Sequence, residues 1–118
     1  METFNVTRVY ADANGESHFE DIKIPLNNAG EIGFLSEAQN AGTVVFRKVV
    51  SQYDYDFHNA PARQYIILTD GIIEIETSLG EIRRFNAGEV LLVEDTKGKG
   101  HKTKNITTQM RSSIFITL

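Results

Sequence analysis

Residues 64–77 read QYIILTDGIIEIET, two apolar runs separated by an Asp-Gly pair at residues 70–71. Runs rich in isoleucine and tyrosine favour strands, and Asp-Gly between them is typical of a tight turn, because glycine accepts a positive φ without steric cost. In the second run Ile73 and Ile75 alternate with two glutamates, so one strand face is apolar and the other charged. The segment predicts an antiparallel hairpin with one buried face.

Short apolar runs closed by turn residues recur along the whole chain. Leu79-Gly80 and Ala87-Gly88 provide two further tight connections. Helical periodicity is nearly absent, which predicts an all-β fold and excludes parallel α/β folds. A small antiparallel barrel or jelly roll also removes exposed strand edges. The expected strands are residues 5–12, 18–26, 43–52, 64–70, 72–77, 82–85, 90–94, 101–110 and 113–118, and residues 27–42 are expected to form a loop with a helical turn at 36–39.

Length and composition limit the classes of function. The chain has 118 residues, of which 41% are hydrophobic, so a single domain over residues 1–118 is expected. A net charge of −4 lacks the positive field that attracts nucleic acid or anionic lipid, so neither is expected as a partner. The absence of cysteine excludes disulfides and thiolate metal sites. With no secretory signal and no apolar run near ~18 residues, a cytoplasmic protein is expected.

Alternation also predicts which side chains face the interior. Lys102 and Lys104 share a strand face, and their charge places that face in water. Their neighbours on the same strand must then point inward. The apolar residues expected inside are Ile66, Leu68, Ile73, Ile75, Val90 and Leu92, and the polar ones are Gln64, His101, Thr103 and Asn105.

The stretch from Phe57 to Gly71 resembles the first conserved motif of the cupin superfamily, G-x5-H-x-H-x3–4-E-x6-G. When Gly71 is aligned with the closing glycine, His58 falls at the first histidine, Ala60 at the second and Gln64 at the glutamate. One of the three motif ligands is therefore retained.

Residues 88–105 resemble the second cupin motif, G-x5-P-x-G-x2-H-x3-N. His101 and Asn105 match its ending, although the loop before His101 is longer and lacks the proline. The two motifs cover close to half of the chain. The resemblance implies a small cupin-like barrel with a site in its mouth.

The residues at the motif positions suggest a possible metal site. Two imidazoles and an amide oxygen, from His58, His101 and Gln64, could hold a divalent ion such as Zn, Ni, Mn or Fe. Losing one histidine and the carboxylate should weaken such a site, because these metals prefer a fuller set of histidine and carboxylate ligands. The alternative, that the two histidines are hydrogen-bonded pocket residues without a metal, stays open.

Several charged residues near the motifs could have either a functional role or an ordinary surface role. Asp54, Asp56 or Glu94 could replace the missing carboxylate, with Glu94 best placed, although surface acids at strand ends are commoner. Arg63 should point away from the interior as a rim cation. Residues 97–100, with two lysines and two glycines, form either a solvated turn or a lid, but not a phosphate loop, because a strand follows.

Other candidates for chemistry are weaker. His18 has no second ligand-type residue at a telling interval and is expected to be exposed. The serines lack the sharp strand-to-helix turn of a nucleophile, so covalent hydrolysis is disfavoured.

Two functions remain. The first is a small-molecule binder of unknown specificity; the second is a metal-dependent cupin enzyme of the isomerase, epimerase or dioxygenase type acting on a small polar substrate, with no catalytic residue assigned. A homodimer is expected, because apolar residues that face outward would leave a second hydrophobic surface exposed on a lone barrel. The ligand-binding residues expected are His58, Gln64, His101, Thr103 and Asn105, and the outward apolar residues are Tyr65, Ile67, Leu91 and Val93.

Overall fold

The computed structural model describes residues 2–118, which form strands joined by turns, confirming the all-β expectation. The one helical element among them is a 3-10 turn, η1 (Gly30–Ile32), and no helix in this range is long and apolar enough to cross a membrane. The strands are β1 (Thr3–Ala11), β2 (Ser17–Pro25), β3 (Asn27–Asn28), β4 (Phe34–Leu35), β5 (Val44–Val49), β6 (Asp54–His58), β7 (Gln64–Leu68), β8 (Ile72–Thr77), β9 (Ile82–Asn86), β10 (Val90–Val93), β11 (His101–Asn105) and β12 (Arg111–Thr117).

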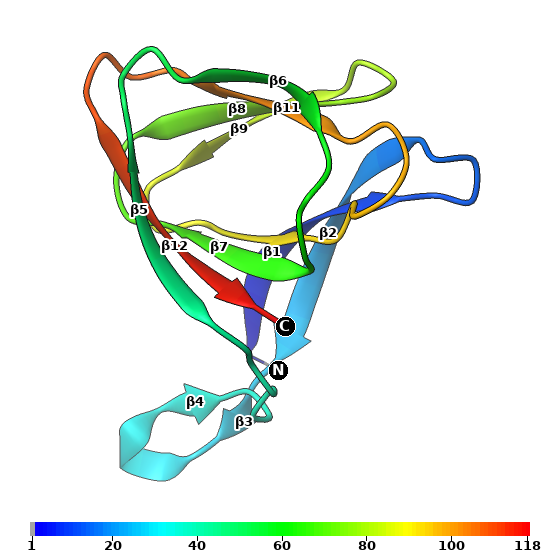
Figure 1. Cartoon of the computed structure of the whole chain (residues 1–118). Coiled ribbons are helices and arrows are strands. Elements are labelled where there is room, and N and C mark those ends of the chain that lie inside the picture. Colours follow the sequence, from blue (N-terminus) through cyan, green and yellow to red (C-terminus); the bar gives the residue numbers. More distant parts are fainter. Residues whose placement is uncertain (1) are drawn as a thin grey trace.

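Two sheets form the barrel. A six-stranded sheet has the order β2-β1-β10-β7-β12-β5 and a four-stranded sheet the order β6-β11-β8-β9. Figure 1 shows the two sheets facing each other, with the β3–β4 ribbon projecting below. Neighbouring strands are antiparallel except for β1 and β10, which pair in parallel. The fold is therefore a jelly-roll barrel, as expected.

Strand β6 is not among the expected strands. Its sequence, DYDFH, alternates acidic and aromatic side chains, and most of them are exposed. The strand lies at the edge of its sheet and is paired only with β11. Its polar, exposed sequence therefore lacks the apolar pattern by which a buried strand is predicted. The strand matters for function because it ends at His58.

The expected helical turn at residues 36–39 is wrong. The chain turns instead at residues 30–32, where Gly30 and Gly33 take positive φ values of 70° and 93°. Residues 36–39 have no regular structure, and Gln39 accepts a hydrogen bond of 2.6 Å from the hydroxyl of Tyr65. Residues 36–39 are thus bonded to β7 through Tyr65 and have no helical hydrogen bonds of their own.

The expected facing of β10 is also wrong. Leu91 lies opposite Ile66, and Val93 opposite Gln64, on the antiparallel neighbour β7. Directly opposed residues share a sheet face, so Leu91 and Val93 point inward, where they line the interior cavity. Val90 and Leu92 consequently face away from the cavity. The other four apolar residues expected inside, Ile66, Leu68, Ile73 and Ile75, do line it.

Candidate functional site

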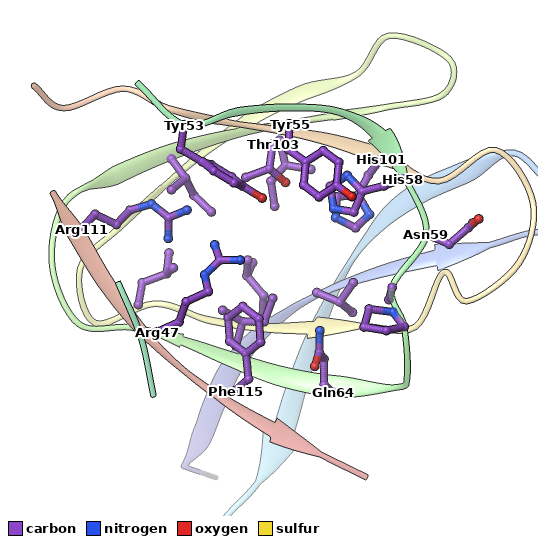
Figure 2. Close-up of a pocket in the computed structure, with 18 residues that line it drawn as sticks. Arg47, Tyr53, Tyr55, His58, Asn59, Gln64, His101, Thr103, Arg111 and Phe115 are labelled. Atoms are coloured by element: carbon purple, nitrogen blue, oxygen red, sulfur yellow. The ribbon is translucent and has the colours of Figure 1, made fainter. Parts of the chain in front are cut away.

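A cavity of about 310 Å³ lies between the two sheets. Figure 2 shows side chains from both sheets arranged around an open centre. Its wall is mainly apolar, with aliphatic and aromatic side chains, and polar side chains interrupt it. The aliphatic part consists of Ile66, Leu68, Ile73, Ile75, Leu91 and Val93.

Two histidines form one polar end of the cavity. His58 on β6 lies directly opposite His101 on β11, and their ring centroids are 4.6 Å apart. Both line the cavity together with Gln64 and Thr103. The structure thus brings together four of the five residues predicted to bind a ligand.

Asn105 is the fifth, and it has a different place. Its side-chain amide donates hydrogen bonds to the carbonyl oxygens of Ser51 and Gln109, each at 3.2 Å, and its carbonyl accepts one from Thr107. The residue is buried but is not among those lining the cavity. Asn105 therefore ties two turns together rather than contacting the interior space.

Gly100 allows the two histidines to approach. It has a positive φ of 76° and precedes His101. A Cβ at this position would lie 2.5 Å from the carbonyl carbon of His58, and closer still to its oxygen. Real Cβ atoms do not come so near to backbone, so only glycine lets the start of β11 pack against the end of β6.

Asp95 binds the Nδ1 atom of His101. Its side chain is fully buried, and its Oδ2 lies 2.5 Å from Nδ1 of His101. With Nδ1 bound to this carboxylate, Nε2 is the ring nitrogen left for a ligand. Asp95 is not among the residues that the motifs predict. The available signal is its position in the loop before His101, next to Glu94.

His58 is oriented in a similar way. Its Nδ1 donates a 2.8 Å hydrogen bond to the carbonyl of Asp56, and Tyr55 stacks on its ring with centroids 4.1 Å apart. Burial lowers the pKa of His58 below its ordinary value of 6.5. The charge of His101 is a smaller cause that lowers the pKa further. A neutral ring that donates through Nδ1 presents Nε2 as a hydrogen-bond acceptor.

The acids considered as metal ligands lie elsewhere. Glu94 shares the outward face of Val90 and Leu92, where it pairs with Arg8 and Arg63 at 2.5 Å each. Asp54 and Asp56 are exposed and do not line the cavity. None of the three supplies a carboxylate to the two histidines.

Histidine and carboxylate side chains alone do not form a metal site within residues 2–118. Across residues 2–118 there is no group of three or more His, Asp or Glu placed to hold a metal ion. Ala60, at the position of the second motif histidine, is buried and lines the cavity. Two imidazoles and the amide of Gln64 are neutral ligands, a weaker set than the histidine and carboxylate combinations typical of Zn, Mn or Fe.

Two arginines form the other polar end. Arg47 on β5 and Arg111 on β12 both line the cavity, and Figure 2 shows their guanidinium groups pointing toward its centre from the side opposite the histidines. Arg111 is only 2% exposed. Burial, and secondarily the charge of Arg47, lowers the pKa of Arg111. Neither arginine is predicted from the motifs, because each lies in a strand outside them.

The remaining predicted features lie outside the cavity. Lys99 pairs with Glu16, and its backbone amide donates to Gly15 at 2.9 Å, so residues 97–100 are tied to the β1–β2 turn and are not a free lid. His18, on β2, is half-buried rather than exposed, because its Nε2 lies 2.6 Å from Asp12. Arg63 is an exposed cation, as expected.

Comparison with known proteins gives structural matches only. No family model and no curated protein sequence matches the chain. Protein NMB1881 from Neisseria meningitidis superposes with a TM-score of 0.50 and 19% identity, covering 64% of this chain and 71% of its own. The conserved SPY1581 protein of unknown function from Streptococcus pyogenes has a TM-score of 0.50 and 15% identity, covering 71% and 68%.

A third match spans nearly all of the chain. The cupin domain of Cnp3 from Schizosaccharomyces pombe has a TM-score of 0.48 and 12% identity over 99% of this chain and 84% of its own. At such identities a likeness concerns the fold alone. Two facing sheets in jelly-roll order give this chain a jelly-roll fold, in which the two motif histidines lie side by side.

Proposed function

We propose that the protein binds a small organic molecule in the cavity between its sheets. The observation that carries this proposal is a partly enclosed, mainly apolar cavity into which a few polar side chains point. Ligand sites are typically concave, about 300–1,000 Å³ in volume, and mostly apolar with a few polar groups that set orientation. A volume of about 310 Å³ suits a compact ligand.

The histidine end is prepared for hydrogen bonding. His58 offers an acceptor at Nε2, and Nε2 of His101 is also free, because both Nδ1 atoms are already bound. Thr103 adds a hydroxyl from the same sheet as the histidines, and Gln64 adds an amide from the facing sheet. This combination of donors and acceptors matches a hydroxyl or carbonyl group on a ligand.

The test is a screen of small organic acids, sugars and aromatic compounds, followed by amide shifts in nitrogen-15 NMR spectra. We expect ligands to shift residues that line the cavity and to lose affinity in His101→Ala. His18→Ala is the matched control, since His18 bonds to Asp12 on the outer hairpin. Ligands that shift only other surfaces, or no ligand at all, would contradict the proposal.

The His101–Asp95 pair favours acid-base catalysis as a second candidate function. A buried carboxylate on Nδ1 fixes the tautomer and the orientation of the ring, as in general-base pairs. If the protein is such an enzyme, a bound ligand should exchange a carbon-bound proton with deuterated water. Asp95→Asn should slow that exchange while binding persists. Unchanged exchange would count against this second function.

A further inference from the structure

The two arginines in the cavity have donors without protein partners. Nε of Arg47 and both Nε and Nη2 of Arg111 are buried and form no hydrogen bond in the described structure. Among residues 2–118 neither side chain forms an ion pair with an acid. The nearby carboxylate of Asp70 is occupied by the backbone amide and hydroxyl of Ser112, at 2.6 and 2.7 Å.

An unpaired buried guanidinium is costly. Burying a charge without a counter-charge or hydrogen bonds opposes folding by several kcal/mol as a rule. Here Arg111 is buried, and the half-buried Arg47 beside it adds a second positive charge to the same cavity. A negatively charged ligand would satisfy both the charge and the open donors.

We propose that Arg47 and Arg111 form the receptor for the oxyanion group, carboxylate or phosphate, of a small organic ligand. This inference rests on the proposed binding function and adds the chemical class of the ligand. Arginine suits the role because its planar fork of N–H donors matches two oxygens of a carboxylate or phosphate.

Aromatic side chains hold the two guanidinium groups. The Tyr53 ring lies 5.1 Å from Cζ of Arg47 and 5.7 Å from Cζ of Arg111, and Phe115 lies 4.8 Å from Arg47. Cation–π contacts stabilise the arginines in place without using their hydrogen-bond donors. The donors therefore stay free for the ligand while the side chains are ordered in advance.

The rest of the cavity fits the body of such a ligand. The arginines and the histidines lie on different sides of the cavity centre (Figure 2), and aliphatic side chains form part of the wall. An apolar or aromatic body can lie along Ile66, Ile75 and Leu91, with its anionic end at the arginines. The ligand class is thus a small organic oxyanion with an apolar body and, at its far end, a group that hydrogen-bonds to His58 or His101.

Benzoate, phenyl phosphate and benzamide test the proposal, because they share a ring and differ in the head group. Isothermal titration calorimetry should show at least one of the two anions binding about tenfold or more tightly than benzamide, as expected when a charged hydrogen bond is lost. Arg111→Gln and Arg47→Gln should remove that preference. Arg84→Gln is the matched control, because Arg84 lies exposed beside Glu74.

The outcomes separate the two proposals. Equal binding of benzamide and both anions overturns the oxyanion inference and leaves the binding function intact, whereas no binding of any compound overturns both. Binding of benzoate alone or phenyl phosphate alone identifies the head group. Arg111→Met checks the fold: a ligand-binding arginine predicts an unchanged or higher melting temperature without ligand, and a marked fall would assign Arg111 to structure and overturn the inference. Arg47→Gln covers the case in which Arg111 variants misfold.

Discussion

Replacing Gly100 with alanine should destabilise the protein more than a similar change at any open turn. The new methyl group would overlap the backbone of His58, so β6 and the start of β11 would have to separate. Because those two strands carry the histidine pair, the change should also weaken ligand binding at that end of the cavity.

The magnitude has two parts. A non-glycine residue at a positive φ costs about 1 kcal/mol or somewhat more. Overlap with a packed backbone adds about 1–3 kcal/mol, giving a total of about 2–4 kcal/mol. Gly80→Ala is the matched control: its φ is 89°, but nothing lies within 4 Å of its Cβ position, so only the first part applies.

Urea denaturation of the two variants measures the difference. We expect Gly80→Ala to lower the free energy of unfolding by about 1 kcal/mol, and Gly100→Ala by about 2–4 kcal/mol, which corresponds to a fall in melting temperature of roughly 8–16 °C. Equal losses in the two variants would refute the claim that backbone contact between Gly100 and His58 requires glycine.

Three further predictions concern protonation, metal and assembly. Because the pKa of His58 is lowered on folding, the unfolded chain binds more protons than the folded one below the ordinary value of about 6.5. Stability is therefore lost as the pH falls through about 6.5, and His58→Gln should lose less over that range. The charged groups facing His58 are His101, Asp95 and Arg47, and equal pH dependence of the two proteins would contradict the assignment. Elemental analysis of protein prepared without chelators should show no stoichiometric Zn, Ni, Mn or Fe if the protein is a metal-free binder, whereas a stoichiometric metal would favour the metal-dependent enzyme. Light scattering at micromolar concentration should give the mass of a homodimer, because Phe46 on edge strand β5 is 78% exposed; a monomer mass would contradict this prediction.

Alternation predicts side-chain facing where polar residues mark every second position. Lys102 and Lys104 lie on the outer face with Glu74 and Glu76, as their charges require. The run Val-Leu-Leu-Val at residues 90–93 has no such mark. Its facing depends on register with β7, which is a property of the assembled sheet.

The candidate site was predictable only in part, for a similar reason. Motif spacing identifies His58 through its interval to Gly71 and His101 through its interval to Asn105. Asp95 and Arg111 look like ordinary charged residues near strand ends, and such residues are usually exposed. Only closure of the two sheets buries Asp95 behind His101 and Arg111 beside Tyr53. A buried charge is therefore a tertiary feature with little local signal.

The parallel pairing of β1 with β10 has a consequence for the order of folding. The β1–β2 hairpin is local and can form early, but its attachment to the barrel joins distant segments: Arg8 and Glu94, which bond across this seam, are 86 residues apart in sequence. Closing so long a loop costs entropy before any contact compensates for it, and non-local strand pairing slows folding. Docking of the hairpin should thus be a late step, and amide protons along the β1–β10 seam should exchange sooner than those between β7 and β12.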